Sequence, residues 1–161
     1  MDDASYERFD SAAGFQDAVD RLLAQPGREL RVFDPDGAAL RLNDSSRLAG
    51  LDGFLAASRT RRLYMIVHDT DHLTRQCPRL LALLARYSHA IQINRTQEHI
   101  RELQDAFLVL DSQHYVRRPK ASFYRGAVGL GDETEALAMR SRFMEIWDAS
   151  FPGVSSTTVG L

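Results

Sequence analysis

Residues 104–111, Gln-Asp-Ala-Phe-Leu-Val-Leu-Asp, constrain the fold more than any other segment of the chain. The five central residues are apolar, polar residues flank them, and Tyr115-Val116 follows after a short polar stretch. An apolar run of this length between turn-forming residues predicts a strand that is covered on both faces, and the next short run predicts its hairpin partner. We therefore expect a buried antiparallel hairpin within a larger sheet.

The rest of the chain alternates helical patterns with short apolar runs. The helical patterns cover residues 15–23, 48–55 and 137–147, and the short runs cover residues 30–33, 63–67 and 90–93. Strands that alternate with helices argue for an α/β layer fold. Because the hairpin adds an antiparallel component, we expect a mixed, largely parallel sheet flanked by helices.

Three segments complete the expected organisation. A helix is expected to begin at Thr70 or Asp71, or at Pro78, since a proline deep inside a helix is costly. A second helical stretch is expected at residues 96–103, just before the hairpin. The Gly-, Ser- and Thr-rich residues 151–161 are expected to form an irregular tail and residues 1–9 an N-terminal extension, which leaves one domain at residues 10–150.

Composition limits the classes of function. A chain of 161 residues with 44% hydrophobic and 26% charged residues suits one globular domain. Twenty basic and 22 acidic side chains give a formal charge of −2, so binding to nucleic acid or anionic lipid would need a local patch. The single Cys77 excludes an intramolecular disulfide, and the chain has neither a secretory leader pattern nor a long apolar stretch. We expect a cytoplasmic protein with no membrane contact.

The spacing within residues 104–111 resembles the phospholipase D-like superfamily, whose signature is His-x-Lys-x4-Asp followed by a β-hairpin and a Gly-Ser-x-Asn turn. Placing the family Asp on Asp111 puts the His position at Gln104 and the Lys position at Ala106. The resemblance covers roughly residues 10–150 and implies a three-layer α/β domain. The chain looks most like small bacterial domains of unassigned function that can accompany acetyltransferase domains, so the resemblance implies an acetyltransferase or another protein as partner. It also implies a two-fold homodimer.

The departures from the signature argue against the family's chemistry. In the family, the His attacks phosphorus, the Lys neutralises the phosphoryl oxygens and the Asp orients an imidazole. Gln104 and Ala106 supply neither nucleophile nor cation, and residues 117–122 replace the Gly-Ser-x-Asn turn. We therefore expect a module without catalytic residues, metal or cofactor that binds a protein or a phosphate-bearing ligand. Gln104 and Asp111 are its first candidate binding residues.

A second group of polar residues follows the apolar run at residues 63–67. Ligands bind at the carboxyl ends of parallel strands, and two such ends are expected to meet here. The candidate residues are His68, Asp69, Asp71 and His72, with Asp34 and Asp36 after the preceding strand. Imidazoles and carboxylates can bind a divalent metal and activate water, so a metal-dependent hydrolase is one alternative function. The favoured interpretation is that Asp69 or Asp71 caps the next helix.

The hairpin region carries a local excess of positive charge. No acidic residue occurs between Asp111 and Asp132, whereas this stretch contains four basic residues with aromatic residues between them. The candidate binding residues are His114, Arg117 and Arg118, and the basic patch extends through Lys120 to Arg125. Basic side chains beside aromatic rings can hold phosphates and stack bases, so nucleic-acid binding is a second alternative function. The simpler interpretation is a solvated hairpin.

Overall fold

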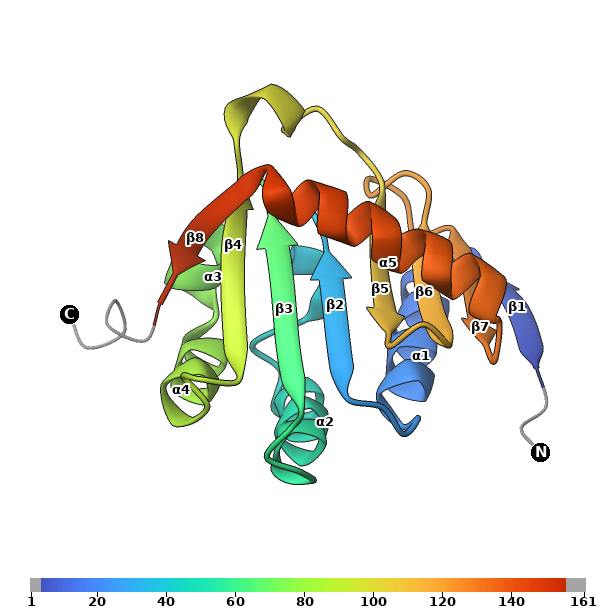
Figure 1. Cartoon of the computed structure of the whole chain (residues 1–161), viewed down its shortest axis with the longest axis horizontal. Helices are drawn as coiled ribbons and strands as arrows, with labels where there is room; N and C mark the ends of the chain where they lie inside the picture. Colours follow the sequence, from blue (N-terminus) through green and yellow to red (C-terminus); the bar gives the residue numbers. More distant parts are fainter. Residues whose placement is uncertain (1–3, 156–161) are drawn as a thin grey trace.

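Helices cover both faces of an eight-stranded sheet in the computed structural model, which describes residues 4–155 (Figure 1). The strands are β1 (Ser5–Phe9), β2 (Glu29–Phe33), β3 (Arg62–Val67), β4 (Ile91–Thr96), β5 (Ala106–Leu110), β6 (His114–Arg118), β7 (Gly126–Leu130) and β8 (Ser150–Val154). The helices are α1 (Ala12–Leu23), α2 (Ser45–Ala56), α3 (Asp71–Gln76), α4 (Pro78–Arg86) and α5 (Glu133–Asp148).

The strand order is β1-β7-β6-β5-β2-β3-β4-β8. Only β2 with β3 and β3 with β4 are parallel, and the other neighbours are antiparallel. The α/β class, the mixed sheet and the β5–β6 hairpin are therefore confirmed, whereas the expectation of a largely parallel sheet is wrong. Parallel pairing occurs only where a helical crossover joins neighbouring strands, and here α2 and then α3 with α4 make those crossovers.

Each face of the sheet has its own apolar core. One core lies between the sheet and α1, α2, α3 and α4, and includes Phe15, Leu51, Leu80 and Leu108. The other lies beneath α5, which crosses the opposite face of the sheet diagonally (Figure 1). There Phe107 and Val109 of β5 pack with Phe143 of α5. Strand β5 contributes to both cores because its successive side chains alternate between the two faces.

The helix boundaries follow from capping and from proline. The Ser11 hydroxyl accepts a hydrogen bond from the Gly14 N–H at 3.0 Å at the start of α1. Both expected starts after β3 are present, because α3 begins at Asp71 and α4 at Pro78. A proline in the first turn of α4 loses no hydrogen bond, since the first N–H groups of a helix have no partner within it.

Two local expectations are wrong. Residues 96–103 do not form a helix: β4 extends to Thr96 and only a short 3-10 turn, Glu98–Ile100, follows. The expected extension and tail both contain edge strands, β1 and β8, while residues 1–3 and 156–161 lie outside the described part of the chain. Pro152 in β8 is tolerated because an edge strand has one side without a hydrogen-bonded neighbour.

A membrane span was not expected from the sequence. Among residues 4–155, no helix has both the length and the apolar character needed to cross a bilayer.

Candidate functional site

A pocket of about 530 Å³ lies where strands β2 and β3 end, and we call it the strand-end pocket. Asp34 follows β2 and His68 follows β3, so the parallel pair brings both to one edge of the sheet. Gln104 precedes β5, which is antiparallel to β2, and Arg118 ends β6 at the same edge. Five sequence candidates line this pocket: Asp34, Asp36, His68, Gln104 and Arg118.

A buried ion pair closes the floor of the strand-end pocket. Arg118 Nη2 donates to Asp34 Oδ1 at 2.5 Å, and both side chains are 3% exposed. The second Asp34 oxygen accepts from the Gly37 N–H at 2.7 Å. Burial raises the pKa of Asp34 from its usual range, while the Arg118 charge and the backbone N–H groups act in the opposite direction. The Arg118 charge is therefore already compensated inside the protein.

Arg118 lies next to Ala106, the residue that the resemblance aligns with the family Lys. Ala106 and Arg118 face each other across the β5–β6 ladder. The guanidinium donates to the Ala121 carbonyl at 2.6 Å and lies 4.6 Å from the centre of the Phe15 ring. These contacts fix the Arg118 side chain at the buried floor of the strand-end pocket, against the Phe15 ring.

His68 is held by hydrogen bonds at both ring nitrogens. Nε2 lies 2.8 Å from the Leu103 carbonyl, and Nδ1 lies 2.7 Å from the Thr96 hydroxyl. A carbonyl can only accept, so Nε2 carries a proton and donates to Leu103, while Nδ1 shares a hydrogen bond with the Thr96 hydroxyl. The ring also packs edge-on against Phe33 at 5.4 Å. This arrangement leaves neither nitrogen open to a metal ion or a substrate.

The remaining residues of the His/Asp cluster belong to the start of α3. Thr70 is the N-cap of α3 and makes no side-chain capping hydrogen bond, so neither Asp69 nor Asp71 is the expected cap; Asp69 precedes the N-cap and accepts from the Asp71 N–H at 2.8 Å. Neither Asp69, Asp71 nor His72 lines the strand-end pocket. Over the described range, 4–155, no three His, Cys, Asp or Glu side chains are grouped so that they could hold a metal ion. The cluster therefore gives no structural support to a metal-dependent hydrolase.

Asp111 and His114 lie at the other end of the hairpin. Gln104 and Asp111 are seven positions apart along a largely extended chain, which corresponds to about 23 Å. Asp111 has φ 55°, and its side chain accepts from the N–H groups of Arg28 at 3.0 Å and Glu29 at 2.9 Å. His114 Nδ1 accepts from the Gly131 N–H at 2.9 Å. The expectation that Asp111 shares a site with Gln104 is wrong, because Asp111 ties the β5–β6 turn to the start of β2.

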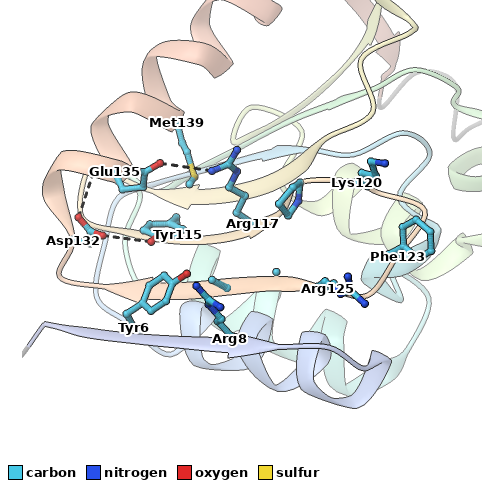
Figure 2. A pocket seen from close by; sticks show the side chains of 13 residues that line it. Tyr6, Arg8, Tyr115, Arg117, Lys120, Phe123, Arg125, Asp132, Glu135 and Met139 are labelled. Carbon is cyan, nitrogen blue, oxygen red and sulfur yellow. Dashed lines mark hydrogen bonds and ion pairs between the residues drawn. The ribbon is translucent and has the colours of Figure 1, made fainter.

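A larger pocket, of about 800 Å³, lies on the α5 face of the sheet near its β1 edge, and we call it the basic groove (Figure 2). Two cross-strand rows form it: Tyr6, Gly129 and Tyr115 in one, and Arg8, Ala127 and Arg117 in the other. The middle strand, β7, contributes only small residues to these rows. A Cβ atom on Gly129 would lie 2.4 Å from the Tyr115 ring. The Tyr115 ring therefore covers Gly129, and the part of β7 that lines the groove is Gly126 and Ala127, whose small size leaves a hollow between Arg8 and Arg117.

The charges of the basic groove are unevenly distributed along its length. Arg8, Arg117, Lys120 and Arg125 line one part, and Asp132 and Glu135 line the end next to α5 (Figure 2). Arg117 and Glu135 are 3.8 Å apart and both are about half exposed, so this ion pair is weak. Arg8, Lys120 and Arg125 have no side-chain hydrogen bond or ion pair with any of the described residues 4–155. Positive charge therefore dominates the end formed by the β6–β7 loop.

Tyr115 marks the acidic end of the basic groove. Its hydroxyl donates to Asp132 at 3.4 Å. Burial, followed by the negative charges of Asp132 and Glu135, raises the pKa of Tyr115 to about 12. The phenol is therefore neutral at physiological pH and serves as a fixed wall of the groove.

Sequence reasoning placed Arg117 and Arg118 together, but they lie on opposite faces of β6. Successive side chains of a strand alternate between faces, so Arg118 points to the strand-end pocket and Arg117 to the basic groove. Tyr6 and Arg8 were missed entirely. Their period-two spacing was the available signal, but β1 lacks the apolar run by which the other strands were recognised. Arg101, which also lines the strand-end pocket, was missed as well, whereas Ser122 and Tyr124 of the expected basic patch line the strand-end pocket and not the basic groove.

Comparison with known sequences matches residues 11–155 to a family model described as a domain of unknown function, DUF7931. None of the curated proteins matches the chain.

Comparison with solved structures gives similar folds at low sequence identity. Nuc from Salmonella typhimurium, a phospholipase D family member, is 12% identical with a TM-score of 0.68, over 95% of this chain and 100% of that one. NucT from Helicobacter pylori is 11% identical with a TM-score of 0.65, over 94% and 100%. TrmBL2, an archaeal chromatin protein with a novel mode of DNA binding, is 13% identical with a TM-score of 0.63, over 92% of this chain but 54% of its own. The fold is therefore phospholipase D-like, and this chain spans about half the length of TrmBL2.

Proposed function

Since the chain belongs to the DUF7931 family and has a phospholipase D-like fold, we propose that it is a non-catalytic module that binds a phosphate-bearing ligand in the basic groove. The buried ion pair between Arg118 and Asp34 carries the non-catalytic part of the proposal. Asp34 compensates the charge of Arg118, which lies opposite Ala106, the position where the family has its phosphoryl-binding lysine.

Covalent phosphoryl transfer needs a nucleophile and a cation that faces the phosphoryl oxygens. The nucleophile position holds the amide of Gln104, and the lysine position holds the buried Ala106. The imidazole nearest to this edge, His68, uses both nitrogens in hydrogen bonds. These observations support the proposal that the strand-end pocket, which lies beside the aligned signature positions, lacks the groups that the family's reaction needs.

The ligand is assigned to the basic groove because its cations are accessible. Arg8, Arg117, Lys120 and Arg125 are all exposed and line one cavity, although the whole chain carries a net charge of −2. Converging cations attract phosphate groups, and this attraction weakens as salt rises. TrmBL2, whose fold is similar, is described as binding DNA, which is consistent with a phosphate-bearing ligand here.

Two assays test this proposal on the purified chain. Bis(p-nitrophenyl) phosphate and a labelled oligonucleotide should remain intact, and a Gln104→Ala variant should give the same background. A Gln104→His/Ala106→Lys variant should also stay inactive, because the new lysine would lie opposite Arg118 and compete with it for Asp34. The non-catalytic part would be contradicted if the unmodified chain hydrolysed either substrate and if Gln104→Ala or His68→Ala abolished that hydrolysis.

The binding part is tested with inorganic polyphosphate by titration calorimetry at low and high salt. We expect binding that weakens with salt and that a Lys120→Glu/Arg125→Glu variant loses. Arg59→Glu/Arg75→Glu is the control with the same change in net charge, since both are exposed cations that do not line the groove. Equal loss in both variants would show that only net charge matters and would contradict a local site.

Four expectations from the sequence and the family resemblance stay predictions. They are the homodimer, an acetyltransferase or other protein partner, a bacterial source and a cytoplasmic location. Sedimentation of the purified chain would test the first directly.

A further inference from the structure

Two exposed aromatic rings stand beside the cations of the basic groove. Tyr6 and Phe123 both line the groove, and each has 59% of its surface exposed. Tyr6 lies two residues before Arg8 on the same face of β1, and Phe123 lies between Lys120 and Arg125 in the β6–β7 loop (Figure 2). Exposure of a large apolar ring to water costs free energy. A pair of exposed rings inside a charged groove therefore indicates a ligand that has flat apolar surfaces as well as negative charge.

Resting on the function proposed above, we infer that the ligand of the basic groove is single-stranded nucleic acid. The cations hold successive phosphates, and Tyr6 and Phe123 stack on unpaired bases. Bases offer a π-face whatever their sequence, and proteins that bind single strands combine such stacking with a positively charged groove. Polyphosphate or an acidic peptide would use the cations but would leave both rings in water.

The width of the groove favours one strand over a duplex. Arg8 and Arg117 flank β7, so two strand spacings, about 10 Å, separate their backbones. One extended phosphodiester chain can pass over a floor of that width between the two guanidinium groups. In a duplex, each base face is covered by its neighbours in the stack, so Tyr6 and Phe123 would find nothing to stack on.

The acidic end of the basic groove limits where the nucleic-acid strand can lie. Glu135 competes with a phosphate for Arg117, because the carboxylate is 3.8 Å from that guanidinium, and Asp132 adds a second negative charge nearby. The phosphates of the bound strand therefore lie along Arg8, Arg117 and the β6–β7 loop, away from α5, and only an uncharged base extends to Tyr6, which stands in the same cross-strand row as Tyr115. Removal of the Glu135 charge should strengthen binding, which a damaged fold would not do.

One of the two exposed rings and one of the four cations lie outside the part of the chain that matches the family model. The match begins at residue 11, whereas Tyr6 and Arg8 belong to β1, Ser5–Phe9. Strand β1 pairs with β7 along its whole length, and this pairing turns a flat edge of the sheet into a groove with two walls. Binding should therefore depend on side chains of β1 as strongly as on those of the β6–β7 loop.

The inference is tested by fluorescence anisotropy with a labelled oligothymidylate, a duplex of the same length and polyphosphate as competitor. We expect the single strand to bind more tightly than the duplex. Tyr6→Ala and Phe123→Ala should each weaken binding by about 5- to 150-fold, which is the range for loss of one stacked base. Arg8→Ala should weaken binding and reduce its salt dependence, Glu135→Gln should tighten it, and Arg59→Glu should leave it unchanged. All five side chains are at least partly exposed, so thermal unfolding should confirm that each variant folds.

The outcomes separate this inference from the proposed function. If polyphosphate competes fully and the Tyr6 and Phe123 variants bind the oligonucleotide normally, the groove binds phosphate and the nucleic-acid inference is overturned. Preference for the duplex would overturn it as well. If neither polyphosphate nor the oligonucleotide binds, the proposed function fails together with the inference.

Discussion

Replacement of Arg118 by methionine tests the feature on which the non-catalytic proposal rests. Methionine keeps an unbranched apolar chain against Phe15 but removes the guanidinium. Asp34 then stays buried, at 2% exposure, without its cation, although its hydrogen bond from the Gly37 N–H remains. The variant therefore leaves one buried charge without its cation, and it also removes the hydrogen bond to the Ala121 carbonyl and the contact of the guanidinium with the Phe15 ring.

The expected cost follows from these contacts. Removal of one partner from a buried ion pair costs about 3–5 kcal/mol, because the other charge is left uncompensated. Arg118 Nε is buried without a hydrogen-bond partner in the described part of the chain, so its removal returns about 1 kcal/mol. We expect Arg118→Met to lower the free energy of unfolding by about 2–4 kcal/mol at neutral pH, a large part of the ~5–15 kcal/mol typical of a domain.

The cost should also depend on pH in a defined direction. Burial raises the pKa of Asp34, and in the variant the Arg118 charge no longer opposes that shift. The folded variant then binds the Asp34 proton more tightly than the unfolded chain does, so lowering the pH favours the folded state. The difference between the variant and the unmodified chain should therefore shrink as the pH falls.

Urea unfolding followed by Trp147 fluorescence measures this cost, and Arg117→Met is the matched control. Arg117 is the neighbouring residue on β6, but its pair with Glu135 is exposed and 3.8 Å long, so its loss should cost no more than about 1 kcal/mol. If Arg118→Met and Arg117→Met unfold at the same urea concentration with the same slope, the Arg118–Asp34 pair does not hold this edge of the sheet, and the reasoning is refuted.

Two further predictions concern side chains away from both pockets. Asp111→Ala should destabilise the chain by about 1–3 kcal/mol in thermal unfolding, because it loses the hydrogen bonds to the Arg28 and Glu29 N–H groups and puts an alanine at φ 55°. Asp111→Asn should cost clearly less, and equal costs would argue against this role. Burial raises the pKa of the Cys77 thiol, so a disulfide reagent such as DTNB should modify the native chain slowly and the urea-unfolded chain quickly. Equal rates would show that the thiol is accessible in the folded state.

The elements with strong local patterns were predictable from the sequence. The apolar runs at β3 and β5 identify buried strands, since no polar side chain interrupts them. Strands β1, β7 and β8 were not identifiable in the same way. Strand β7 contains Gly126 and Gly129, and β8 contains Pro152, so their local preferences argue against a strand. Pairing within the sheet overrides these preferences, and such pairing depends on residues far apart in the chain.

The candidate sites were predictable to a similar extent. Gln104 and His68 were expected at strand ends and do line one pocket, because strand direction alone places them there. The basic groove was only half predicted. The β6–β7 loop carries a visible run of cations, but Arg8 joins it through the pairing of β1 with β7, which joins residues more than a hundred positions apart. Asp111 was misplaced because a linear signature does not show that its members lie at opposite ends of one strand.

Incubation of the purified chain with a labelled single-stranded oligonucleotide, followed by separate measurement of bound and cleaved label, tests the central claim most directly. We expect the label to be retained by the protein and recovered at full length, with retention lost in Tyr6→Ala and at high salt. Cleaved label that disappears in the His68→Ala variant would contradict the claim, because it would show that the strand-end pocket still breaks phosphodiester bonds.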